Sequence, residues 1–134
     1  MLCLLAVVSC SRPEAFVQFR NSAGDGSRYD FDVPFTRPDA EYSTYVAFSA
    51  ASALLRCDSI PARIVLVSPS GIMAAENVSF PLSGVRFAGS AVEFPYRSAV
   101  RVAQDTGMWH LSLILRDSSQ YTEVLGAGFR YELK

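Results

Sequence analysis

The stretch that decides the fold is GMWHLSLILR, residues 107–116. On a two-residue period, one side of it carries only large apolar side chains, which are Trp109, Leu111, Leu113 and Leu115. The other side carries His110, Ser112 and Ile114. Because side chains alternate across a β-strand, this pattern predicts a strand about 30 Å long with one apolar face. The stretch holds the only tryptophan of the chain, so we expect it to be a central strand of the core.

The composition indicates one folded domain without a nucleic-acid partner. The chain has 134 residues, of which half are hydrophobic and 19% are charged. This length suits a single domain with its own core, and the hydrophobic content argues against a disordered chain. Twelve Lys and Arg stand against thirteen Asp and Glu, giving a net charge of −1. Proteins that bind nucleic acid carry a basic patch, and the sequence shows none.

Short segments with strand patterns and turn residues between them fill the rest of the chain. We expect strands at 15–20, 29–35, 42–49, 63–67, 72–75, 77–82, 85–87, 91–96, 99–103 and 124–133. No stretch shows the period of an amphipathic helix over three turns. The sequence therefore predicts an all-β fold, an antiparallel β-sandwich of jelly-roll type with about eight strands, in one domain over residues 16–134.

Three local features add detail to this prediction. Pro34 lacks an amide hydrogen, which favours an edge strand or a strand end for residues 29–35. The β-branched run at residues 63–67 is typical of a strand buried on both faces. Gly126 and Gly128 inside the last strand predict a bulge or a close backbone approach.

The first ten residues resemble the signal of a bacterial lipoprotein. Residues 1–8 are apolar, too short to span a bilayer, and typical of the h-region of a signal peptide. The sequence VVSC at residues 7–10 resembles a lipobox, which implies cleavage before Cys10 and attachment of lipid, such as palmitate, to its thiol. Residues 1–9 would then be the signal peptide and residues 10–15 a lipidated tether.

Two further points concern this N-terminal segment. No Lys or Arg precedes the apolar run, so we expect the true signal to begin upstream of Met1. The alternative is a short buried N-terminal strand. Under the signal-peptide interpretation Cys3 is removed and only Cys57 remains beside the lipidated Cys10, so an internal disulfide is excluded and a buried, inert thiol is expected.

The order of these features resembles the gliding-motility lipoprotein GldH family of Bacteroidetes. The matching parts are the lipobox, the aromatic strand 29–35, the Tyr-rich strand 42–48, Pro69-Ser70-Gly71, Phe94-Pro95, Gly107-Met108-Trp109 and the closing segment 125–131. The resemblance implies an outer-membrane, lipid-anchored protein of the cell envelope, on either its periplasmic or its surface face. It also implies other envelope proteins as partners, among them the motility and secretion machinery of this phylum.

Candidate catalytic and metal-binding residues each have a simpler structural interpretation. His110 is the only histidine, and its mid-strand position favours a solvated side chain over a catalytic base. Asp30 and Asp32 lie two apart on one strand face and offer oxygen ligands for Ca²⁺, but the rest of a calcium loop is missing. We therefore assign no catalytic, cofactor-binding or metal-binding residue and expect a non-enzymatic protein.

Two other patterns point to carbohydrate. Five tyrosines, which are Tyr42, Tyr45, Tyr96, Tyr121 and Tyr131, offer either a sugar-stacking platform or core packing. The sequence therefore leaves a surface carbohydrate-binding lipoprotein as the alternative function. Asp58-Ser59-Ile60 resembles the O-glycosylation site of secreted Bacteroidetes proteins, with Ser59 as the acceptor.

Overall fold

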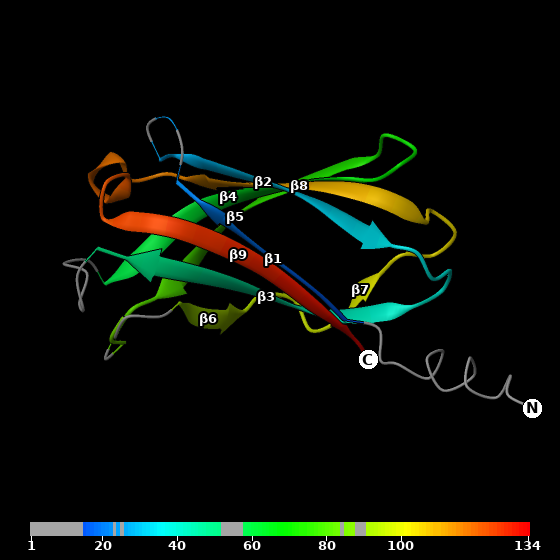
Figure 1. The fold of residues 1–134 in the computed structure, drawn as a ribbon. Coiled ribbons are helices and arrows are strands. Elements are labelled where there is room, and N and C mark those ends of the chain that lie inside the picture. The colour runs from blue at the N-terminus through cyan, green and yellow to red at the C-terminus, as the bar shows by residue number, and fades with distance from the viewer. Residues whose placement is uncertain (1–14, 23, 25, 52–57, 84, 88–90) are drawn as a thin grey trace, which may run out of the picture.

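The chain folds into strands joined by turns (Figure 1). The computed structural model describes residues 15–134 except 23, 25, 52–57, 84 and 88–90. Within this part the strands are β1 (Ala15–Asn21), β2 (Arg28–Phe35), β3 (Glu41–Ala50), β4 (Ser59–Val67), β5 (Met73–Pro81), β6 (Val92–Pro95), β7 (Val100–Arg101), β8 (Gly107–Leu115) and β9 (Val124–Leu133). The 3₁₀ turn η1 (Ser118–Gln120) follows β8.

The strands form two antiparallel sheets stacked face to face (Figure 1). Sheet A has the order β1-β9-β3-β6, with β7 also pairing β3, and sheet B has the order β2-β8-β4-β5. The chain crosses between the sheets repeatedly, so neighbours in a sheet are mostly distant in sequence. This arrangement is that of a jelly roll, and the predicted all-β sandwich is confirmed.

The strand predicted as central lies in the middle of sheet B. β8 pairs with β2 on one side and with β4 on the other. Leu111, Leu113 and Leu115 face the core and are buried, which confirms the predicted alternation. Trp109 is only partly buried, at the end of the core, where its ring packs edge-on against Phe35 with centroids 5.5 Å apart.

Aromatic rings from both sheets fill the space between them. Phe35 of sheet B stacks on Tyr131 of sheet A at 5.0 Å, and Tyr42 lies 4.8 Å from Phe35. At the other end of the sandwich Phe48 packs against Phe80 at 5.3 Å. Such ring pairs add to the stabilisation from buried area, so the core is held together across the sheets as well as along them.

Several predicted strands differ from the structure. The strand expected at 63–67 begins earlier, at Ser59, and is not buried on both faces, because the outer face of sheet B carries the exposed Arg63. Pro61 is tolerated inside β4 because β8 pairs with β4 only from Ala62 onward. The segments 72–75 and 77–82 form one strand, β5, and 85–87 forms no strand, since the amide of Val85 donates instead to Leu82 O in a turn.

Two other local predictions are confirmed. β2, which contains Pro34, is an edge strand that pairs only with β8. The ring of Phe19 lies against Gly126 and Gly128, where an added Cβ atom would come within 2.7 Å of ring carbons. The register of β3 with β9 also shifts between Ser49 and Ala50.

Several N-terminal and loop predictions lie outside the described residues. They include the signal peptide at 1–9, the lipidated Cys10 and the first residues of the tether, as well as Cys57. In the part of the chain that the structure does describe, no helix has the length and apolar character needed to cross a membrane.

Candidate functional site

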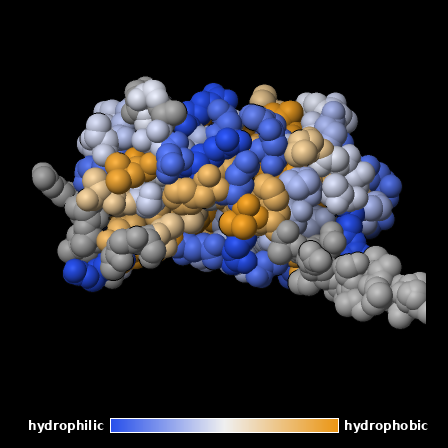
Figure 2. Space-filling view, in the orientation of Figure 1, coloured by the Kyte–Doolittle hydropathy of each residue, from blue (hydrophilic) through white to orange (hydrophobic). Residues whose placement is uncertain are grey.

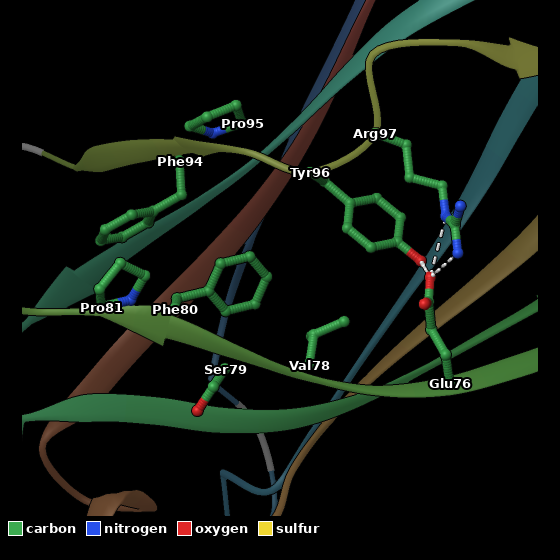
Figure 3. A pocket seen from close by; sticks show the side chains of 9 residues that line it. All are labelled: Glu76, Val78, Ser79, Phe80, Pro81, Phe94, Pro95, Tyr96 and Arg97. Carbon is green, nitrogen blue, oxygen red and sulfur yellow. Dashed lines mark hydrogen bonds and ion pairs between the residues drawn. The ribbon is translucent and has the colours of Figure 1, made fainter.

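A groove opens between the edges of the two sheets (Figure 3). β5 is the last strand of sheet B and β6 is the last strand of sheet A, and the two do not pair. The groove has a volume of about 560 Å³. It is lined by Glu76, Val78, Ser79, Phe80, Pro81, Phe94, Pro95, Tyr96 and Arg97. We call it the β5–β6 groove.

The base of the groove is apolar. Phe80 from β5 and Phe94 from β6 are both buried, with ring centroids 5.7 Å apart, so they close the core beneath the groove. Val78 stands beside them and is partly exposed (Figure 3). Pro81 and Pro95 form exposed parts of the wall. A partner that covered this surface would remove apolar area from water, which favours association.

A polar bridge crosses the groove from one sheet to the other. The phenol of Tyr96 donates a hydrogen bond to Glu76 Oε2. Arg97 donates to the same oxygen through Nε at 2.9 Å and Nη2 at 2.7 Å (Figure 3). Tyr96 and Arg97 follow β6, whereas Glu76 lies in the middle of β5. The sheets are therefore linked at their open edge by one carboxylate.

The backbone just after β6 explains why both side chains point at Glu76. Tyr96 N donates to Thr44 O at 2.9 Å, and Thr44 N donates to Arg97 O at 2.8 Å. Two residues thus oppose the single residue Thr44, which is the pattern of a β-bulge. Thr44 Oγ1 accepts from Arg97 N at 2.9 Å and fixes the bulge. Bulges redirect side chains, and this one turns Tyr96 and Arg97 toward β5.

The bridge has a defined charge state at neutral pH. The hydrogen bond from Tyr96, reinforced by Arg97, lowers the pKa of Glu76 below its usual range. Burial, together with the hydrogen bond to Glu76, raises the pKa of Tyr96 to about 12. Glu76 is therefore an anion and Tyr96 a neutral donor, and the Glu76–Arg97 pair adds no net charge to the groove.

A second, smaller hollow continues beyond the bridge. Its volume is about 260 Å³, and it shares Glu76, Tyr96 and Arg97 with the first. Its remaining lining is apolar, made of Ile64, Leu66, Ala74, Ala75, Ala99 and Val100. The bridge thus separates two apolar lobes along the same edge of the sandwich.

The residues weighed for catalysis and metal binding form a separate cluster on the outer face of sheet B. His110 Nδ1 lies 3.0 Å from Asp32 Oδ1, and the side chain is 48% exposed. Asp30 Oδ1 accepts from Ser112 Oγ at 2.6 Å and from Arg28 Nε at 3.0 Å. Burial opposes ionisation of Asp30, but these hydrogen bonds and the Arg28 charge prevail and lower its pKa.

The polar side chains of this cluster pair with neighbours on the same sheet face, as polar side chains on the outer face of a sheet commonly do. Ser112 gives its hydrogen to Asp30, so it is not poised as a nucleophile toward His110. Within the described residues no group of three or more His, Cys, Asp or Glu side chains is arranged to hold a metal ion. Asp25, which precedes Asp30 and Asp32 in the adjoining loop, lies outside the described residues.

The five tyrosines do not form a common platform. Tyr42 and Tyr131 are buried in the core, where their rings lie 4.6 Å apart. Tyr45 lies on the outer face of sheet A, with the guanidinium of Arg130 at 4.0 Å from its ring centre. Tyr121 lies after β8, and its phenol donates a hydrogen bond to Leu115 O at 3.5 Å. Of these five tyrosines only Tyr96 lines the groove.

Ser59, the predicted glycosylation site, is the first residue of β4. It is partly exposed, and its Oγ accepts a hydrogen bond from Ser79 Oγ at 3.2 Å. Its carbonyl accepts from Nε2 of the buried Gln120 at 2.9 Å. The backbone of Ser59 is therefore fixed at the end of sheet B.

A second apolar surface belongs to sheet A. A band of apolar residues crosses the face of the molecule seen in Figure 2. Val17 and Phe19 of β1 and Leu125 of β9 are among the exposed large apolar side chains. Phe19 covers the small residues Gly126 and Gly128.

Comparison with known proteins assigns no family. No protein-family model matches the chain, and no curated protein matches it. Among solved structures it is similar to infectious bursal disease virus Gx strain, at 12% identity and a TM-score of 0.44 over 91% of this chain and 32% of that one. A protein of Sulfurospirillum deleyianum is similar at 10% identity and a TM-score of 0.46, over 92% and 99% of the two chains.

An insecticidal delta-endotoxin of Bacillus thuringiensis is also similar, at 11% identity and a TM-score of 0.48, over 91% of this chain and 19% of the toxin. The chain spans about a third of the length of the viral protein that it matches. Likenesses this distant say nothing of activity or partners.

Proposed function

We propose that this chain is a lipid-anchored, non-enzymatic protein of the cell envelope that binds other envelope proteins through the β5–β6 groove. The observation that carries the proposal is the form of this groove. It is apolar, runs between two sheet edges and is divided by a bridge whose ion pair has no net charge. Apolar hollows with a few fixed polar groups are the surfaces at which proteins bind ligands and partners.

The groove favours a protein partner over a sugar. An exposed pair of coplanar aromatic rings, which would stack on the faces of a sugar, would favour a carbohydrate site. Phe80 and Phe94 are buried, and their planes differ by 45°, so they do not provide such a pair. Tyr96 is partly buried and directs its hydroxyl to Glu76. The carbohydrate-binding alternative therefore has no platform among the described residues of the groove.

The cellular setting of the proposal comes from the sequence. The lipobox-like VVSC at residues 7–10 supports a lipid anchor at Cys10, and two or three acyl chains give stable attachment to a membrane. The resemblance to the GldH family supports the outer membrane as the location. It also supports the motility and secretion machinery as the source of the partner.

The proposal is tested by co-purification from native membranes with charge substitutions in and beside the groove. Val78→Arg and Ala74→Arg place a cation in the larger and the smaller lobe, whereas Met108→Arg adds the same charge to the outer face of sheet B, away from β5. Quantitative mass spectrometry should show partner proteins reduced about tenfold or more by the first two and retained by Met108→Arg. Equal recovery with all three variants would contradict the proposal. Ala74 is exposed, so Ala74→Arg remains informative if Val78→Arg disturbs the fold.

A further inference from the structure

We propose that the occupant of the β5–β6 groove is an extended segment of a partner protein that adds to sheet B as a strand beside β5. This inference rests on the proposed function, because it takes the groove as the binding site. It adds the mode of binding and the sequence pattern of the partner. Three observations carry it: the direction of the β5 backbone groups, the lack of protection on this edge, and the side chains along it.

The hydrogen-bond pattern of the β4–β5 hairpin shows which backbone groups of β5 point outward. Ser68 N donates to Ile72 O at 2.9 Å, and Leu82 N donates to Asp58 O at 2.8 Å, one at each end of the ladder. Hydrogen-bonded pairs alternate along an antiparallel ladder, so the even-numbered residues of β5 pair with β4. The N–H and C=O groups of Ala75, Asn77 and Ser79 therefore point away from the sheet.

No described residue occupies those outward groups. β5 pairs with β4 alone, and the hydrogen bonds of the described residues include none to the main chain of Ala75, Asn77 or Ser79. The outward-pointing residues are two apart in sequence, so an N–H donor and a C=O acceptor recur along this edge about every 7 Å. The backbone of another strand has the same repeat, which is why strand addition supplies affinity in many peptide complexes.

The edge of β5 lacks the features that protect other edges of this molecule. Proteins block free edges with proline, cations or short strands. Here β1 carries Arg20, β2 carries Pro34, β6 is four residues long with Pro95, and β7 is two residues long with Arg101. β5 spans nine residues and has proline only at its last position, Pro81; its one charged side chain, Glu76, faces inward and is paired with Arg97. Among the described strands it is thus the longest free edge, and it carries no cation and no mid-strand proline.

The side chains that face the groove predict a pattern for the added strand. Ala74 lies in the smaller lobe, Glu76 at the bridge and Val78 in the larger lobe, each two residues from the next. All three hydrogen bonds to Glu76 end on Oε2, and no described residue donates to Oε1. A matching strand would place apolar side chains in the two lobes and a donor, Lys, Arg, Ser or Thr, between them at Glu76.

The first experiment uses a phage-displayed library of random dodecapeptides, selected on the purified full chain. Selected peptides should share apolar residues at positions i and i+4 with a donor at i+2. Asn77→Pro should weaken their binding about tenfold or more, because it removes an outward N–H and no bond to β4. Asn77→Ala keeps that N–H and should bind as the wild type does. Peptides that bind Asn77→Pro and the wild type equally would overturn strand addition but leave the groove as the binding site.

Amide hydrogen exchange distinguishes a strand from any other groove ligand. Without peptide, Ala75, Asn77 and Ser79 should exchange fast and their even-numbered neighbours slowly. Bound peptide should slow the odd-numbered amides specifically, and uniform protection would overturn the inference. If Asn77→Pro fails to fold, the peptide is varied in place of the protein, by N-methylation of either its odd-numbered or its even-numbered amides. Only the set of amides that faces β5 should abolish binding when methylated. Failure to select any peptide would also overturn the inference. So would a wild-type protein that forms a dimer, if the dimer persists in Asn77→Ala and dissociates in Asn77→Pro. In that case the occupant of the groove would be a second copy of this chain.

Discussion

Tyr96 and Glu76 are bound to each other across the open edge of the sandwich. The phenol of Tyr96, which follows the edge strand of sheet A, donates to the carboxylate of Glu76 in the middle of the edge strand of sheet B. The strands that carry them do not pair, so this contact and the adjacent Arg97–Glu76 ion pair hold the two edges at a fixed separation. The shape of the groove therefore depends on this bridge.

The first prediction concerns the strength of this contact. Tyr96→Phe removes the hydrogen bond but keeps the ring, and it should lower the free energy of unfolding by about 1–2 kcal/mol at pH 7. Hydrogen bonds to a charged acceptor can stabilise a fold by more than this. A smaller loss of stability is expected here because Glu76 is one-third exposed, so that solvent screens its charge. Urea denaturation at pH 7 measures the difference. An unchanged midpoint would show that the bridge does not stabilise the fold.

The second prediction is the pH dependence of the same difference. The bridge lowers the pKa of Glu76 below its ordinary value of 4.5, so the folded state favours the ionised form. Stability from the charged contact is therefore present above pH 4.5 and is lost as pH falls through the folded-state pKa. The difference between wild type and Tyr96→Phe should be largest near neutral pH and shrink below pH 4.5. The other carboxylates contribute equally to the pH dependence of both proteins, so their effect cancels in the difference. A stability difference that grew on acidification would contradict the lowered pKa of Glu76.

The third prediction concerns Trp109 and its neighbour. Trp109 Nε1 donates to Asp105 O at 2.8 Å, and its ring packs against the buried Phe35. Trp109→Ala should cost about 3 kcal/mol, at the low end for such a deletion because the ring is partly exposed. His110→Ala, on the outer face, should cost less than about 1 kcal/mol. Denaturant melts that reversed this order would contradict the phase of β8.

The fourth prediction separates the two glycines beneath Phe19. A Cβ atom on either glycine would approach the Phe19 ring at 2.7 Å. One on Gly126 would also come within 2.9 Å of the Arg20 carbonyl, whereas one on Gly128 would lie 3.2 Å from the Gln18 carbonyl, a contact that is tight but less severe. An exposed ring can move aside and a backbone in a ladder cannot. Both alanine substitutions should destabilise by about 1–3 kcal/mol. Phe19→Ala should relieve Gly128→Ala but not Gly126→Ala, and equal relief in the two double mutants would show that the backbone contact has no effect.

The fifth prediction concerns the anchor. Cys10→Ala should abolish labelling with radioactive fatty acid and release the protein from the membrane fraction. Cys57→Ala is the matched control and should retain both properties. Membrane association that survives Cys10→Ala would contradict the lipid-anchor proposal.

The sequence predicts the strands of this fold more completely than its site. Alternation places Leu111, Leu113 and Leu115 on one face correctly because that face of β8 is apolar and buried, whereas the other carries His110, Ser112 and the half-buried Ile114. The run at 63–67 misled the prediction, since β-branched residues suit a strand whether one or both of its faces are buried. Residues 85–87, expected as a strand, form none, because short apolar runs do not specify whether a partner strand is within reach.

The groove was not predicted, and the reason is geometric. Glu76 and Tyr96 are twenty residues apart on strands that do not pair, so no spacing in the sequence brings them together. Tyr96 was counted among tyrosines that the structure places in different parts of the molecule. The available signal was the proline at the end of β5 and the proline in β6, since both mark sheet edges, and edges are where such a groove opens.

The measurement that tests the central claim most directly is site-specific photo-crosslinking in living cells. Benzoylphenylalanine would replace Val78 or Ala74 in the groove, Val17 on the outer face of sheet A, and Arg63 on the outer face of sheet B. The account predicts a discrete protein adduct from the two groove positions and none from the two outer faces. Adducts from Val17 or Arg63, with none from Val78 and Ala74, would contradict it.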